Sequence, residues 1–136
     1  MSSRDDNIAT QEKAAERLNA GDVDAGVDIM FAADAVDHDP APFQGQGREG
    51  FRQFFHYLVS GFPDFTITPE RMVADDDSIA FAYTLTGTHQ GEFEGVAATG
   101  RRVEVRGLQL GRFENGQIVE RWGATDMAGL LSQLQA

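Results

Sequence analysis

Cysteine is absent from the 136-residue sequence, which rules out a disulfide framework and a thiolate metal site. Basic residues are scarce: 11 Lys and Arg stand against 22 Asp and Glu, and the formal net charge is −11. Such a chain repels nucleic acid and anionic membranes at long range, so we expect neither as a partner. No apolar run approaches the roughly 18 residues of a membrane span, and the opening MSSRDDNIATQEK lacks the apolar segment of a signal peptide. These absences predict a cytoplasmic protein.

The apolar content is sufficient for one folded unit. Hydrophobic residues make up 41% of the chain, and no long biased segment interrupts it. A chain of this length can bury a core and still leave a modest cavity. We therefore expect a single domain over residues 1–136.

The first half of the chain has helical periodicity. Apolar residues at helical spacing predict a helix over the first 20 residues, which Gly21 ends, and Asp22 can cap a second short helix over 23–31. A short strand over 35–37 and a loop rich in Pro and Gly follow. The main packing helix is predicted by aromatic and aliphatic residues at i, i+3, i+4, i+7, i+8 and i+11, namely Phe51, Phe54, Phe55, Leu58, Val59 and Phe62.

The second half changes to a period of two. We expect strands near 65–74, 78–89, 101–113 and 117–125, with a final short helix over 127–134. Asn115-Gly116 is the strongest hairpin signal, because both residues tolerate positive φ. Helices followed by an antiparallel meander predict an α+β fold, with helices gathered on the concave face of a curved antiparallel or mixed sheet. Such an arrangement tends to enclose a pocket between sheet and helices.

Strand alternation selects the side chains that face this pocket. Phe81 and Tyr83 share one face of strand 78–89 with Ile79, Leu85 and His89, and Val105 shares one face of strand 101–113 with Gln109. The opposite face of strand 101–113 carries Leu108 and Leu110 among charged residues. A homodimer formed sheet to sheet through this outer face explains the two leucines, although scattered exposed leucines are common.

Asp126 has three interpretations. It lies where the last strand meets the last helix, so it can cap that helix. It can also face an aromatic pocket and exchange protons near neutral pH, or it can be a plain surface charge.

Neither the three histidines nor the remaining motifs indicate a metal site or a catalytic nucleophile. His38 and His89 lie near the predicted cavity and can act on a ligand or serve as structural hydrogen-bonders, whereas His56 borders an apolar helix stripe and is interpreted as structural. No metal site is predicted, because the side chains of adjacent strand residues around His38 point to opposite faces. Neither a nucleophilic serine motif nor a phosphate-binding glycine loop is present.

Several segments carry a family resemblance. They are HDP at 38–40, FPDF at 62–65, GTHQGEFEGVAATGRRV at 87–103, GRFENGQIVERW at 111–122 and TDMAGLLSQL at 125–134. Together they resemble the SnoaL-like polyketide cyclase family of the nuclear transport factor 2-like superfamily, over about residues 8–134. The resemblance implies a cone-shaped α+β barrel, commonly dimeric, that holds a small hydrophobic ligand without metal or organic cofactor.

The resemblance also suggests residue roles. In the aromatic polyketide cyclases an aspartate shortly before the last helix is the general acid/base of an intramolecular aldol closure, and Asp126 matches it. A histidine on the preceding long strand is replaced here by Gln109, which can hydrogen-bond a carbonyl or orient the aspartate but cannot take a proton. We expect Gln109, His89 and His38 to bind carbonyl oxygens. The expected substrate-binding residues are Trp122, Phe81, Tyr83, Phe93, Phe43, Phe62, Val105 and Glu120.

Three functions stay open at this point. The first is a cyclase or isomerase of a polyketide-like substrate that uses acid/base catalysis. The second is an epoxide-opening cyclase or hydrolase, for which Glu120 is the first choice as second carboxylate. The third is a non-catalytic binder of a small hydrophobic molecule.

Overall fold

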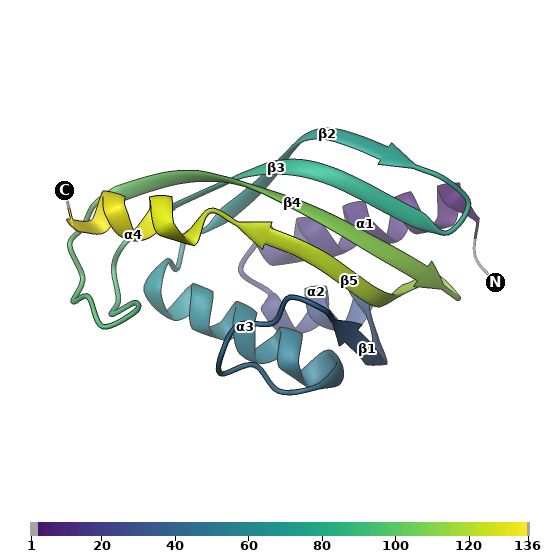
Figure 1. Cartoon of the computed structure of the whole chain (residues 1–136), viewed down its shortest axis with the longest axis horizontal. Helices are drawn as coiled ribbons and strands as arrows, with labels where there is room; N and C mark the ends of the chain where they lie inside the picture. Colours follow the sequence, from purple (N-terminus) through teal and green to yellow (C-terminus); the bar gives the residue numbers. More distant parts are fainter. Residues whose placement is uncertain (1–2, 136) are drawn as a thin grey trace.

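The computed structural model describes residues 3–135. Over these residues the chain forms four helices and five strands, in an order that Figure 1 follows from purple to yellow. The elements are α1 (Arg4–Asn19), α2 (Val23–Met30), β1 (Phe31–Asp37), α3 (Gly47–Gly61), β2 (Thr66–Ala74), β3 (Ser78–Thr88), β4 (Arg102–Glu114), β5 (Gln117–Thr125) and α4 (Met127–Gln135). In that part of the chain, no helix combines the length and the hydropathy needed to cross a membrane.

The strands form one mixed sheet with the order β1-β5-β4-β3-β2. β1 pairs with β5 in parallel, and the other neighbours are antiparallel. The sheet curves over α1, α2 and α3, while α4 continues from β5 at one end (Figure 1). β1 and β2 are its two open edges, so the sheet is not closed. The predicted α+β cone, with helices on the concave face, is confirmed.

The boundary between α2 and β1 differs from the prediction. The sequence predicts a helix over 23–31 and a strand of three residues, whereas α2 ends at Met30 and β1 starts at Phe31. Long-range contacts hold Phe31 extended: it pairs with Ile118, and its carbonyl accepts hydrogen bonds from Arg48 Nε at 2.8 Å and Gln117 Nε2 at 3.2 Å. Helical periodicity cannot report these distant partners.

The amphipathic pattern of α3 divides between core and cavity. Phe51 and Leu58 are buried, and the Phe51 ring stacks on Phe31 with centroids 3.8 Å apart. Phe54 and Phe55, on the same stripe, are only partly buried. The helix therefore leaves an aromatic surface facing the sheet.

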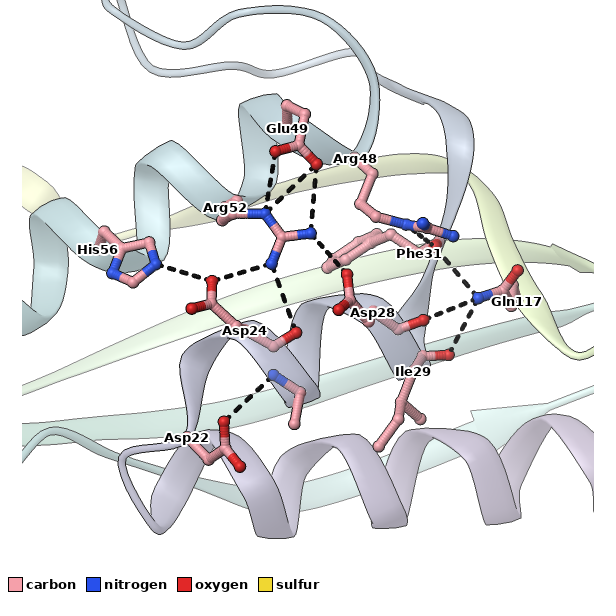
Figure 2. Close-up of polar contacts among 11 residues, drawn as sticks. Asp22, Asp24, Asp28, Ile29, Phe31, Arg48, Glu49, Arg52, His56 and Gln117 are labelled. Atoms are coloured by element: carbon pink, nitrogen blue, oxygen red, sulfur yellow. Dashed lines mark hydrogen bonds and ion pairs between the residues drawn. The ribbon is translucent and has the colours of Figure 1, made fainter.

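An ionic cluster joins α2 to α3 on the outside of the helical layer. Figure 2 shows the Arg52 guanidinium between Asp24 and Asp28 of α2 and Glu49 of its own helix, with His56 beside Asp24. His56 is thus a surface partner of a carboxylate, which agrees with its structural interpretation. Gln117 of β5 reaches the carbonyl oxygens at the end of α2, so the same corner is also tied to the sheet (Figure 2).

Candidate active site

A cavity of about 520 Å³ lies between the sheet, α3 and the loop that follows β1. Its aromatic wall consists of Phe31, Phe43, Phe51, Phe54, Phe55 and Tyr57. A smaller recess of about 60 Å³ shares part of this lining and reaches Phe81, Tyr83 and Leu85 on β3. Rings on one side and polar strand residues on the other are typical of a small-molecule site.

Strand register determines which polar groups face the cavity. On β4 and β5 the pairs Gln109↔Gly123 and Gly107↔Thr125 lie on the inner face. Gln109 and Thr125 also line the recess, where the Tyr83 hydroxyl lies 2.6 Å from Thr125 Oγ1. Arg121 shares this face, two residues before Gly123.

Arg121 is the central polar group of the cavity. Its Nε donates to Gln109 Oε1 at 3.2 Å and its Nη1 donates to Asp37 Oδ1 at 3.2 Å. The Arg121 and Asp37 side chains are only 15% and 8% exposed. Among the described residues, Nη2 of Arg121 and Nε2 of Gln109 have no partner, so both can donate to a ligand oxygen.

Asp37 serves to hold the guanidinium. Besides Arg121, its carboxylate accepts from Gln44 Nε2 at 2.9 Å and from the backbone N–H of Asp39 at 3.0 Å. A buried ion pair needs such additional bonds to offset its desolvation. Asp37 is therefore an anchor for both Arg121 and the loop after β1.

Asp39 presents a second carboxylate to the cavity. Its Oδ2 accepts the backbone N–H of Gly123 at 2.9 Å. Within the described part of the chain, its Oδ1 makes no hydrogen bond, and the side chain has no ion-pair partner. Unlike Asp37, it has an oxygen available for chemistry.

The far rim of the cavity is formed by Tyr57 and Glu94. The Tyr57 hydroxyl donates to Glu94 Oε1 at 3.1 Å and accepts the Glu94 backbone N–H at 2.8 Å. Burial raises the pKa of the Tyr57 hydroxyl, so it stays protonated and keeps donating. The Phe43 ring lies 4.8 Å from the Tyr57 ring, and the two aromatics flank the mouth.

Asp126 does not line the cavity. Its Oδ1 accepts the backbone N–H of Gly129 at 2.9 Å, the bond of a helix N-cap, and its side chain is exposed. The lining includes Thr125 and Met127, its two neighbours in sequence. The structure supports the capping interpretation of Asp126, and the predicted position in the pocket is wrong.

Trp122, Glu120 and His38 lie on the outer face of the sheet, contrary to their predicted place in the pocket. Trp122 pairs with Leu110 and Glu120 pairs with Arg112, both outward residues of β4. The His38 ring stacks on Trp122 with centroids 4.6 Å apart, and its Nε2 lies 2.9 Å from Glu120 Oε2. Hydrogen bonds from His38 and then Arg112 lower the pKa of Glu120, so it stays ionised. Trp122 and Glu120 share one face of β5, as alternation predicts, but that face is the outer one.

His89, Phe93, Phe62 and Val105 belong to the core and do not line the cavity. All four residues are at most 4% exposed: Val105 4%, Phe93 1%, and Phe62 and His89 0%. The Thr99 backbone N–H donates to His89 Nδ1 at 3.2 Å, so this nitrogen is an acceptor and the loop 90–99 contacts the ring through Thr99. Phe93 contacts the cavity only indirectly, through the Tyr57 ring at 4.8 Å.

Four predicted residues do line the hollow space. Gln109 borders both parts, Phe43 borders the mouth, and Phe81 and Tyr83 border the recess. Sequence reasoning missed Arg121, Asp37, Asp39, Tyr57 and Glu94. The position of Arg121 could have been predicted from the sequence. If Trp122 is placed on the outer face beside the outward leucines, alternation along the strand puts Arg121 on the inner face. The described residues contain no group of three or more His, Cys, Asp or Glu side chains placed to hold a metal ion.

Comparison with known proteins identifies a family and several solved structures that are similar to this chain. The sequence profile described as SnoaL-like polyketide cyclase matches residues 8–134. IdmH from Streptomyces antibioticus, described as a candidate polyketide cyclase, is 33% identical with a TM-score of 0.81, and the alignment covers 98% of this chain and 99% of that one. AclR from Streptomyces galilaeus, described as a candidate hydroxylase, is 28% identical with a TM-score of 0.85 and 98% coverage of both chains. TsrD from Streptomyces laurentii is 25% identical with a TM-score of 0.87 and the same coverage. No individually curated protein sequence matches the chain significantly.

Proposed function

The chain belongs to the SnoaL-like polyketide cyclase family, and from this premise we propose that it is a cofactor-independent acid/base enzyme. Its substrate is a small hydrophobic, polyketide-like molecule with an enolisable carbonyl group. The reaction is a ring closure or an isomerisation through an enolate.

One observation carries this proposal: in an aromatic cavity, a guanidinium that uses only part of its hydrogen-bond donors lies beside a side-chain amide. Arg121 and Gln109 are held by each other and by Asp37, and each keeps one nitrogen available. Donors fixed before the reaction, in a site shielded from water, stabilise an oxygen on which negative charge develops. A carrier of apolar molecules has no need of a buried arginine in its cavity.

The aromatic walls support the ring closure. Phe54, Phe55 and Phe43 can hold a flexible chain folded while its carbonyl oxygen contacts Arg121 and Gln109. Holding the reacting ends together can lower the barrier by up to about 7–11 kcal/mol in ideal cases. The enolate carbon then attacks a second carbonyl in an aldol closure, or takes up a proton at another position in an isomerisation.

Epoxide opening is the second candidate, and it needs two carboxylates in one site. Glu120 does not supply the second one, because it lies on the outer sheet face. Asp39 and Glu94 both line the cavity, and this pair of carboxylates favours keeping the alternative. One would protonate the epoxide oxygen while the other activates a hydroxyl or water.

We also propose a homodimer through the outer face of the sheet. Leu108 of β4 is 64% exposed and Leu110 is 39% exposed, and Val36 on β1 and Val73 on β2, the two edge strands, are 48% and 57% exposed. Leu110 adjoins Trp122 on this face, so the apolar surface is continuous across β4 and β5. Burying it against a second copy removes that surface from water.

Titration of bound 2-naphthol tests the oxygen site. This aromatic hydroxyl compound resembles an enol, and its neutral and ionised forms absorb differently. We expect the protein to bind the ionised form more tightly, so the naphthol pKa falls on binding. Gln109→Leu should reduce this shift, and the double variant Arg121→Met/Asp37→Asn should abolish it without leaving a buried unpaired charge.

Arg112→Met is the matched control, because Arg112 lies on the outer face and its loss should leave the naphthol shift unchanged. Binding of only the neutral form would contradict the proposed oxyanion site and indicate a carrier of apolar molecules. Absence of 2-naphthol binding would contradict the aromatic cavity as a ligand site.

A further inference from the structure

The strand position opposite Gln109 has no side chain of its own. Gly123 pairs directly with Gln109 across β4 and β5, on the face that lines the cavity. A Cβ added to Gly123 would lie 2.6 Å from the Leu108 carbonyl oxygen and 3.1 Å from Arg121 Nη2. The backbone and the guanidinium thus occupy the space in which a catalytic side chain on β5 would start.

A carboxylate from another segment of the chain lies beside Gly123. Asp39, in the loop after β1, places its Oδ2 2.9 Å from the Gly123 nitrogen. The chain on either side is restrained, because the Asp39 backbone N–H is held by Asp37 Oδ1 at 3.0 Å and Pro40 follows. Asp39 is therefore positioned before any ligand arrives.

The other carboxylates near the cavity are less suited to remove a proton. Asp37 is occupied by Arg121, Gln44 and the Asp39 backbone. Glu94 accepts from the Tyr57 hydroxyl at the rim, on the loop 90–99. Asp126 caps α4 and lies outside the lining.

We propose that Asp39 is the catalytic base of this site, placed by the loop after β1 beside the Gly123 backbone of β5. The inference rests on the proposed enolate chemistry and assigns the group that performs its proton transfer. Asp39 and Arg121, which both lie beside Gly123, then act on the same substrate unit.

The step is a balanced proton transfer. Oδ1 of Asp39 takes a proton from the carbon next to the substrate carbonyl, the C–H electron pair becomes the C=C bond of the enolate, and the carbonyl oxygen gains the negative charge. Arg121 Nη2 and Gln109 Nε2 donate to that oxygen. In an aldol closure the enolate carbon bonds to a second carbonyl carbon, and protonated Asp39 returns its proton to the alkoxide formed. In an isomerisation it returns the proton to a different carbon.

Two measurements on Asp39→Asn distinguish a base from a structural residue. The first is deuterium exchange at the α-carbons of 2-tetralone in D₂O, followed by NMR. We expect the wild-type protein to accelerate exchange over buffer, and the variant to lose about 100-fold or more of that acceleration.

The second measurement is 2-naphthol binding to the same variant. When the enolate is present Asp39 is protonated and neutral, and asparagine imitates that neutral form. Removing the negative charge should strengthen binding of the ionised naphthol by about tenfold. A residue that only holds the loop would give the opposite result, because Arg121 would lose its setting and binding would weaken.

Asp126→Asn is the matched control, since it makes the same chemical change outside the cavity and asparagine still caps a helix. We expect wild-type exchange and wild-type naphthol binding. If Asp39→Asn retains the exchange, or binds naphthol more weakly than the wild type, the assignment of Asp39 is overturned. Tight binding of ionised naphthol by the wild type would leave the proposed function standing. Wild-type protein that neither accelerates exchange nor binds ionised naphthol overturns both.

Discussion

At the scale of single residues, the ion pair of Arg121 and Asp37 is the most consequential contact of the molecule. Both side chains are largely buried, so neither charge is solvated without the other. Sequence reasoning could not pair them, because they are 84 positions apart and meet only through the parallel β1–β5 contact.

We expect Arg121→Met to lower the free energy of unfolding by about 3 kcal/mol, because it leaves Asp37 buried and uncompensated. The double variant Arg121→Met/Asp37→Asn should recover most of this loss. Urea unfolding followed by circular dichroism measures both. Equal destabilisation in the single and double variants would mean that packing of the arginine stem matters more than the charge.

Asp126 gives a second prediction at this scale. Removing the N-cap with Asp126→Ala should lower the free energy of unfolding by about 1 kcal/mol, whereas Asp126→Asn should be nearly neutral. Thermal unfolding of the two variants tests the difference. If alanine and asparagine behave alike, the bond to the Gly129 N–H contributes nothing to stability.

At the scale of elements, two tight turns with positive φ behave differently toward prediction. Asn115 and Gly116 join β4 to β5 with φ of 52° and 76°, as the sequence predicts. Glu94 and Gly95 adopt φ of 50° and 75° between Phe93 and Val96, which form a bridge, and here glutamate replaces the asparagine that such turns favour. The Tyr57 hydroxyl holds this unfavourable residue through its N–H and its carboxylate.

Alanine at each turn glycine should cost about 1 kcal/mol through backbone strain, because neither Cβ would meet a close neighbour. Gly116→Ala should lower global stability, since β4 and β5 are central strands. Gly95→Ala should increase only local opening, seen as faster hydrogen exchange at the Phe93 and Val96 amides. A global loss in Gly95→Ala would show that the loop 90–99 unfolds together with the core.

The elements themselves were largely predictable, whereas the site was predictable only in part. Periodicity located α3 and the four long strands, and alternation placed Gln109 and Tyr83 on the inner face, because these patterns are local. Asp39 escaped prediction because a loop position has no periodicity. Trp122 was misplaced because large aromatics suit a pocket and an interface equally well.

At the scale of the whole molecule, acidic groups make stability depend on pH. Asp64 is an example: the Thr88 backbone N–H at 2.7 Å, and then the Thr88 hydroxyl, lower the pKa of its carboxyl below the ordinary 3.8. A lowered folded pKa gives stability that is present above the unfolded value and is lost as pH falls through the folded one.

Asp64→Asn should therefore destabilise the protein at neutral pH, and the difference from wild type should shrink as pH falls below about 3.8. Unfolding by urea at pH 6 and at pH 3 provides the comparison. Asp34→Asn, an exposed position on β1, is the control. A difference that persists unchanged at pH 3 would assign the Asp64 effect to packing.

The proposed dimer gives the last prediction at this scale. Leu108→Glu/Leu110→Glu places two charges on the outer face and should shift the protein to a monomer in sedimentation velocity. The cavity lies on the other face, so ligand binding measured on the folded monomer should be retained. A wild-type protein that sediments as a monomer would contradict the dimer.

The segment Asp37–Asp39 also makes the two faces of the sheet mechanically dependent on each other. Asp37 and Asp39 face the cavity, while His38 between them stacks on Trp122 outside. The three residues share one restrained backbone, so none can be displaced without moving the others. A substitution at His38 that shifts this backbone would therefore also shift the carboxylates that hold Arg121 and contact Gly123.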